Sequence, residues 1–213
     1  GDSDCPKDVL FGSEMEHNRN DIYLAQRDGE VVASCNTIRS MAVPQLGGFG
    51  EVATKPEYRG QGLATDLCRR ALQDFGDDGG EALFLGTDNP AAARIYHRLG
   101  WRKLAGSNVM ASIRSADSPE AFLVDYFHTL GNVTIRPTGP AQRVPMIPLL
   151  HTPHDWQVLD ANVGMYSTRY DIQGSCNGLY RRYGYVVNGD RGRCFGAVTD
   201  DGRVVGLSTA RLL

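Results

Sequence analysis

The stretch EVATKPEYRGQGLATDL, which runs from Glu51 to Leu67, constrains the fold of this chain more than any other. Two glycines, Gly60 and Gly62, stand between a short strand-like run and a long helix-forming run. Apolar side chains recur every four residues after the loop, at Leu63, Leu67, Ala71 and Phe75. This spacing predicts a helix that begins at Leu63. The glycines of this strand–loop–helix unit provide either a tight turn or a bare backbone for a phosphate.

Three known phosphate-binding patterns compete for this loop. A P-loop needs a lysine directly after its second glycine, and the chain has no such lysine. A dinucleotide fingerprint needs a third glycine, but Thr65 stands at that position. The pattern [RQ]-x-x-G-x-[GA] is met in full, by Arg59, Gly60, Gln61, Gly62, Leu63 and Ala64.

The physical chemistry of a helix start explains why this third pattern binds phosphate. The first amides of a helix have no partner inside the helix, and the helix dipole adds about half a positive charge there. Glycine lets a phosphate approach without meeting a Cβ atom. The loop therefore predicts a cradle for a cofactor that carries two linked phosphates.

Composition sets limits on the class of protein. The 213 residues fit one large domain or two modest ones, with the 41% hydrophobic content of an ordinary globular protein. No apolar run approaches the ~20 residues that span a bilayer, and no signal peptide is recognisable. The five cysteines are scattered, without a C-x-x-C pair, which is typical of a reducing compartment. We therefore expect a cytoplasmic protein with no membrane partner.

Further elements of the first half can be predicted from short patterns. Strands are expected at Ile22–Ala25 and Val31–Ile38 on either side of a turn at Asp28-Gly29, at Glu51–Thr54 after a glycine turn at 47–50, and at Ala82–Leu85. A second helix is predicted, with Asn89 as its N-cap, Pro90 at its first position and Gly100 at its end. Closing strands are expected at Trp101–Leu104 and Asn108–Ile113, so the fold class is α/β.

Two segments together, VATKPEYRGQGLATDL and NPAAARIYHRLGW, resemble the GNAT superfamily of N-acetyltransferases over about residues 21–113. The resemblance implies a GNAT fold, with a mixed, mostly antiparallel sheet flanked by helices. It implies binding of acyl-coenzyme A, with acetyl-CoA as co-substrate, and direct transfer of the acyl group to an amine. The residues implied to bind the cofactor are Val52, Ala53, Thr54, Arg59, Gly60, Gln61, Gly62, Leu63, Ala64, Thr65 and Asn89.

The resemblance also implies the catalytic residues. Tyr96, on the predicted second helix, matches the family's tyrosine that protonates the leaving thiolate. Glu51, at the head of the strand before the loop, is the candidate base, although ordered water can serve instead. An amide of that strand, aimed at the thioester carbonyl, would stabilise the developing negative charge. No metal ligands are expected from the family.

The second half departs from the family pattern. Residues 1–132 carry a net charge of −6 and residues 133–213 a net charge of +3, which suggests separate units. We expect an acyl-CoA-binding domain at 1–116, a connecting helix at 117–132, and a partial GNAT-like unit without a cofactor loop at 133–213. The hairpin sequence DGEVVAS at Asp28–Ser34 returns as DGRVVGLS at Asp201–Ser208. The chain is then either a piece of a tandem GNAT protein or a permuted domain whose second half completes the first sheet.

Other functions remain open at this point. A non-catalytic acyl-CoA sensor or scaffold would use the same loop, and a nicotinamide-dependent oxidoreductase would use Gly60, Gly62 and Asp88. The tyrosines between Tyr166 and Tyr185 lie beside arginines, but we expect packing rather than RNA stacking, and hence no nucleic-acid partner. His151, His154 and Asp155 are a weak metal candidate. The acceptor is a small-molecule or peptide amine of unknown identity, and the oligomeric state is unknown.

Overall fold

Six strands form a mixed sheet in the order β1-β2-β3-β4-β6-β5. A computed structural model describes residues 7–128, 131–187 and 191–212. The strands are β1 (Asn18–Arg27), β2 (Glu30–Ser40), β3 (Leu46–Thr54), β4 (Ala82–Gly86), β5 (Arg102–Lys103) and β6 (Val109–Ile113). Neighbouring strands are antiparallel except for β3 and β4, which are parallel. The predicted α/β class with a mostly antiparallel sheet is confirmed.

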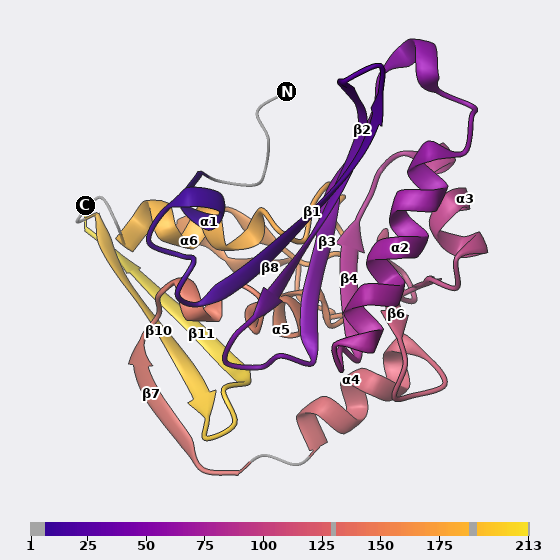
Figure 1. Cartoon of the computed structure of the whole chain (residues 1–213). Coiled ribbons are helices and arrows are strands. Elements are labelled where there is room, and N and C mark those ends of the chain that lie inside the picture. The colour runs from indigo at the N-terminus through magenta and orange to yellow at the C-terminus, as the bar shows by residue number, and fades with distance from the viewer. Residues whose placement is uncertain (1–6, 129–130, 188–190, 213) are drawn as a thin grey trace.

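One face of this sheet is covered by the two helices that the sequence predicted. They are α2 (Leu63–Asp77) and α3 (Pro90–Arg98), and Figure 1 shows both on the same side of the sheet. Of the four residues that the spacing predicted on the packed face of α2, Leu63, Ala71 and Phe75 are buried and Leu67 is partly buried. The core on this side joins the two helices to the sheet through Phe49, Leu83 and Trp101.

The second half covers the opposite face. Its strands β7 (Val133–Pro137), β10 (Gly192–Thr199) and β11 (Val204–Arg211) form a separate three-stranded sheet in the order β11-β10-β7. The other elements outside the main sheet and its two helices are α1 (Lys7–Phe11), η1 (Pro56–Tyr58), α4 (Pro119–His128), η2 (Pro140–Gln142), α5 (Met146–His151), β8 (Val158–Asp160), η3 (Ala161–Val163), β9 (Met165–Tyr166) and α6 (Leu179–Val187). Side chains of α5 and α6, among them Ile147 and Tyr183, share one core with Ile38 and Phe84 of the main sheet. The two halves therefore meet through buried apolar side chains.

The predicted glycine turn at 47–50 is wrong, because those residues lie inside β3. A Cβ at Gly47 would lie 2.6 Å from Cδ2 of Leu83, and one at Gly48 would lie 1.9 Å from Oδ1 of Asn177. Glycine is therefore needed here for close packing in the strand, not for a turn. The sequence pattern alone could not separate these two uses.

We predict that Gly48→Ala lowers the free energy of unfolding by about 1–3 kcal/mol, the usual cost of overpacking. The reason is the collision with Asn177, so Asn177→Ala introduced together with Gly48→Ala should restore most of the loss. Gly139→Ala is the matched control, because nothing lies within 4 Å of a Cβ there. Urea unfolding of the unaltered chain and these three variants measures the effect, and a double variant no more stable than Gly48→Ala alone would contradict the packing.

A buried ion pair ties the start of the chain to the second half. Nε and Nη2 of Arg143 donate to the two carboxylate oxygens of Glu14 at 2.5 and 2.7 Å. The side chains of Arg143 and Glu14 are only 2% and 7% exposed. Nη1 of Arg143 also donates to the backbone oxygen of Asn177 at 2.7 Å. The pair therefore fixes Glu14 and the backbone before α6 in one place.

We predict that Arg143→Met lowers the free energy of unfolding by about 3–5 kcal/mol, because it leaves the Glu14 carboxylate buried without its partner. Arg169→Met is the matched control, since Arg169 pairs with Asp155 at an exposed site. An exposed pair contributes about 0–1 kcal/mol. Urea unfolding of both variants checks the prediction. Equal losses in the free energy of unfolding would show that the buried pair stabilises the fold no more than the exposed one.

Candidate functional site

The glycine loop has the open geometry that an anion site needs. Gly60 and Gly62 have φ angles of 77° and 84°, values that favour glycine, and Gly62 is the N-cap of α2. Nothing lies within 4 Å of a Cβ at Gly60, and the nearest atom to one at Gly62 is Oδ2 of Asp66 at 4.0 Å. Among the described residues, no side chain caps this helix start. The amides of the first turn of α2 therefore face solvent without a partner within the helix.

The polar side chains beside the loop make hydrogen bonds and an ion pair with neighbouring residues. Nε of Arg59 donates to the backbone oxygen of Thr54 at 3.1 Å, and Nε2 of Gln61 donates to that of Glu57 at 3.3 Å. Asp66 lies in the first turn of α2 and pairs with Arg69 at 2.7 Å. This pairing offsets part of the repulsion that an incoming anion would meet from Asp66. The backbone, rather than a cluster of cations, is thus the main anion-binding group of the loop.

The strand before the loop contains a β-bulge at Glu51. Ser34 pairs with Ala53 and Asn36 pairs with Gly50, so two residues, Glu51 and Val52, lie opposite Cys35. Glu51 has a φ angle of 52°, which is uncommon for a residue with a side chain. Oγ of Ser34 donates to the Glu51 carbonyl at 3.2 Å and supports the bulge. Such bulges redirect backbone and side chains next to active sites, and this one directs the strand that leads to the loop.

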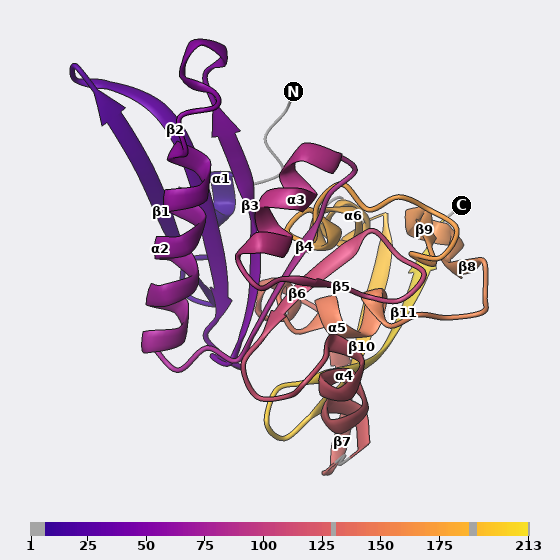
Figure 2. The same cartoon turned by 90° about the vertical axis from the view of Figure 1, so that its right-hand side faces the viewer.

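Strands β3 and β4 separate close to this bulge. Their parallel pairing covers Leu46–Ala82, Gly47–Leu83 and Gly48–Phe84 and extends no further within residues 7–128. Figure 2 shows the two strands diverging towards the end of β3. We call the region beyond the Gly48–Phe84 pair the strand separation. Backbone groups of β3 there have no neighbour in β4, so a bound molecule can reach them.

Tyr96 lies on α3 with its ring against the strand separation. The ring packs edge-on against Phe49, with centroids 6.0 Å apart, and against Trp101 at the same distance. Phe49 is the residue of β3 that follows the last pair with β4. Burial, with smaller contributions from Cys68 and Cys35, raises the pKa of Tyr96 well above its usual value. The phenol therefore keeps its proton at neutral pH, as a proton donor must.

Asn89 caps α3, as predicted. Its Oδ1 accepts hydrogen bonds from the backbone nitrogens of Ala91 and Ala92 at 2.9 and 3.4 Å. The residue is exposed, and its own backbone nitrogen donates to Oγ1 of Thr87 at 3.2 Å. The cap fixes the start of α3, and through it the helix that carries Tyr96.

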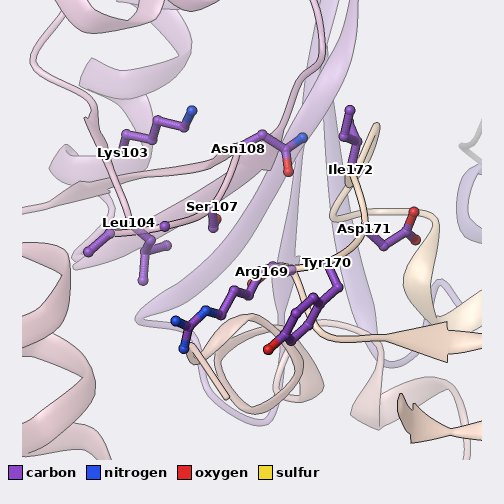
Figure 3. Close-up of a pocket in the computed structure, with 11 residues that line it drawn as sticks. Lys103, Leu104, Ser107, Asn108, Arg169, Tyr170, Asp171 and Ile172 are labelled. Carbon is purple, nitrogen blue, oxygen red and sulfur yellow. The ribbon is translucent and has the colours of Figure 1, made fainter. Parts of the chain in front are cut away.

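A cavity of about 480 Å³ lies where the two halves meet. The β5–β6 loop lines one side with Lys103, Leu104, Ala105, Gly106, Ser107 and Asn108, and the second half lines the other with Thr168, Arg169, Tyr170, Asp171 and Ile172. Figure 3 shows side chains of the two segments facing each other across it. The sequence pointed to no pocket here, because neither segment carries a recognisable motif.

The sequence reasoning did not identify Asn108 and Asn177, whose side chains connect the two halves of the chain. Nδ2 of Asn108 donates to the backbone oxygens of Thr87 and Gln173, at 3.3 and 2.7 Å. Oδ1 of Asn108 accepts from the backbone nitrogen of Gln173 at 3.1 Å. Asn177 packs against Gly48 in β3. No local signal could have identified these residues, because their partners in the other half lie 65 or more positions away in the chain.

The remaining candidates lie elsewhere. Burial lowers the pKa of His151 to about 3, the His154 ring stacks on Trp156, and Asp155 pairs with Arg169. The described residues hold no group of three or more His, Cys, Asp or Glu side chains placed to bind a metal. No helix in the described part of the chain is long and apolar enough to cross a membrane.

The described cysteines are core residues, whereas the second-half tyrosines divide between the core and the surface, where Tyr166, Tyr170 and Tyr185 are exposed. Cys35, Cys68, Cys176 and Cys194 are free and buried, and Cys5 lies outside the described residues. The Cys68 thiol and burial together raise the pKa of Cys35, which does not favour a nucleophile. Of the tyrosines in the second-half cluster, Tyr180 and Tyr183 are buried.

Comparison with known proteins agrees with this geometry. The first 101 residues match the acetyltransferase (GNAT) family. The matched residues include the bulged strand, the glycine-lined helix start and the capped helix with the buried tyrosine. The chain carries a GNAT-family domain in its first half.

Individual relatives are more distant. An uncharacterized N-acetyltransferase of Methanocaldococcus jannaschii is 24% identical over 95 residues, 42% of each chain. A mycothiol acetyltransferase of Nocardia farcinica is 30% identical over 137 residues, 62% of this chain and 41% of that protein. A solved putative GNAT acetyltransferase from Desulfovibrio desulfuricans is 16% identical with a TM-score of 0.43, covering 50% of this chain and 74% of that one. The chain spans about two fifths of the length of the curated relatives it matches.

Proposed function

We propose that this protein is an acyl-CoA-dependent N-acyltransferase that transfers an acetyl group from acetyl-CoA directly to an amine. The observation that carries the proposal is the open helix start at Gly62, placed directly after the bulged end of β3. Its amides would bind the pyrophosphate of coenzyme A, and the space that a Cβ would occupy at Gly60 is open, with no atom within 4 Å. The family of the first half supports the same activity.

Acetyl-CoA would supply an activated thioester carbonyl. Residues Arg59–Thr65 would hold its pyrophosphate, and the backbone of Val52–Thr54 would hold the pantetheine and thioester. Asn89, besides capping α3, would contact the pantetheine. A β3 amide directed at the carbonyl oxygen would stabilise the negative charge that develops there.

Two side chains would move protons. Tyr96, whose phenol is protonated at neutral pH and whose pKa burial raises further, would donate a proton to the departing thiolate. Glu51, placed by the bulge within β3, would accept the proton of the amine directly or through water. The two roles are independent, so a variant that lacks one of these side chains can still be used to measure the contribution of the other.

The second half would shape the acceptor side. We propose the domain boundaries 1–116, 117–132 and 133–213, with the last part a partial GNAT-like unit that lacks a cofactor loop. In its support, β7, β10 and β11 pair in the order of an opening strand followed by a hairpin. Free buried cysteines favour a reducing compartment, which supports a cytoplasmic location.

A thiol-release assay with acetyl-CoA and a panel of small-molecule and peptide amines tests the proposed activity. We expect acceptor-dependent release of coenzyme A and a product that carries an N-acetyl group. The alternative, a non-catalytic acyl-CoA sensor or scaffold, predicts binding of acetyl-CoA with no acceptor-dependent release. Absence of both binding and release would refute the two hypotheses together.

A further inference from the structure

One segment of the second half crosses the strand separation. A Cβ at Gly86, the last residue of β4, would lie 2.4 Å from the backbone oxygen of Gln173. Four residues further along, the amide of Asn177 lies against β3, with Oδ1 1.9 Å from a Cβ at Gly48 and Nδ2 3.0 Å from one at Gly50. The segment Gln173–Asn177 therefore runs from the end of β4 to the middle of β3, where the two strands no longer pair.

The segment presents polar atoms that have no hydrogen-bond partner. Gln173 is 3% exposed and Asn177 is 1% exposed. Nε2 of Gln173 and both Oδ1 and Nδ2 of Asn177 are buried without a partner among the described residues. Buried amide groups in folded proteins are nearly always hydrogen-bonded, because losing water without a replacement is costly. A bound molecule with complementary polar groups would satisfy them.

The segment is held in place from both ends. Asn108 makes two hydrogen bonds with the backbone of Gln173, at 2.7 and 3.1 Å. At the other end Arg143, itself paired with Glu14, donates to the backbone oxygen of Asn177 at 2.7 Å. The backbone of the segment is thus fixed independently of the two free amide side chains. Such preorganisation is what a specific binding site requires.

The segment begins next to the cavity of Figure 3, which is lined by Ile172 and by Asn108, the hydrogen-bond partner of the Gln173 backbone. A second cavity of about 240 Å³ is lined by Gln173, Ser175 and Arg182. The strand separation is reached by Tyr96 and Phe49 from the α2–α3 face of the sheet, and by Asn177 and Ile147 from the opposite face.

We propose that Gln173 and Asn177 bind the acceptor, and that this acceptor carries an amide or a comparable hydrogen-bonding group next to its reactive amine. This inference rests on the proposed acetyl transfer. A carboxamide side chain has both a donor and an acceptor, and so does an amide on the ligand, so the two groups can pair in both directions. An alkyl amine would leave both side chains unsatisfied and would bind more weakly.

The test uses two acceptors of the same shape. Glycinamide and isobutylamine differ in that an amide replaces a branched hydrocarbon next to the aminomethyl group. We expect the full chain to use glycinamide. We expect Asn177→Leu, which keeps the side-chain size, to lower kcat/KM for glycinamide at least tenfold. For isobutylamine the same variant should change kcat/KM less than twofold. Each amine is compared with itself in the two proteins, so the different basicity of the two amines cancels when the two fold changes are divided.

Controls separate this inference from folding and from the proposed function. Calorimetry with acetyl-CoA should give the same affinity for Asn177→Leu and the unaltered chain. Tyr183→Phe is the matched control, since it also removes a buried polar atom without a partner among the described residues of the second half. It should leave the ratio of kcat/KM for glycinamide to kcat/KM for isobutylamine unchanged. Gln173→Met is the second variant and should act in the same direction as Asn177→Leu.

Three results would overturn the inference while leaving acetyl transfer intact. The first is an equal loss of kcat/KM for both amines in Asn177→Leu, and the second is no loss of kcat/KM for either amine. The third is failure of the unaltered chain to use glycinamide although it acetylates other amines. Failure of the unaltered chain to bind acetyl-CoA would instead refute the proposed function itself.

Discussion

Replacing Tyr96 by phenylalanine should lower kcat by about 10²- to 10⁴-fold, the usual contribution of a positioned acid. The change removes one oxygen atom and keeps the ring, which packs against Phe49 and Trp101. The fold and the cofactor site should therefore be preserved, and the affinity for acetyl-CoA should change less than twofold. Steady-state kinetics with the best acceptor of the panel, together with calorimetry, measure the two quantities.

The matched control is Tyr126→Phe. Tyr126 is also a buried tyrosine whose pKa is raised by burial, and its oxygen has no partner among the described residues. It lies on α4 in the core between the sheet and the second half. An equal loss of kcat in both variants would attribute the effect to stability, and an unchanged kcat in Tyr96→Phe would remove Tyr96 from the mechanism.

Replacing Gly62 by glutamate should weaken acetyl-CoA binding about 10- to 100-fold. Hydrogen bonds to a charged group contribute about 1.5–3 kcal/mol each, and the new carboxylate would repel the pyrophosphate at the same amides. Because Gly62 has a φ angle of 84°, the substitution also strains the backbone. A control must therefore carry the same strain.

Gly79 provides that control near the other end of the same helix. Its φ angle is 82°, and nothing lies within 4 Å of a Cβ there. Gly79→Glu adds the same charge and a similar strain at a distance from the helix start, so its affinity for acetyl-CoA should stay within about twofold of the unaltered chain. Equal weakening by Gly62→Glu and Gly79→Glu would mean that the anion does not bind at the start of α2.

Local patterns were sufficient to predict the parts of the site that one stretch of chain builds. The helix from Leu63, the left-handed glycine at its start and the Asn89 cap all depend on neighbours within four residues. The mixed sheet was implied by the resemblance to the GNAT superfamily rather than by these local patterns. Periodicity and capping are properties of the chain itself, so no distant contact was needed.

Long-range packing accounts for what the sequence did not predict. Gly47 and Gly48 lie in a strand because Leu83 and Asn177 press against them, and these partners are 36 and 129 residues away. The bulge at Glu51 depends on the register with β2, which the strand sequence does not encode locally. The Glu14–Arg143 pair likewise joins residues whose separation no pattern reveals.

The most direct test of the central claim follows the backbone amides of a ¹⁵N-labelled chain by NMR. Coenzyme A and pantetheine share the thiol arm, but only coenzyme A carries the pyrophosphate. If the start of α2 binds that group, coenzyme A will shift the amides of Gly60 and Gly62–Thr65, whereas pantetheine will leave them in place. Shifts of equal size with both compounds, or no shift at these amides with coenzyme A, would contradict the account.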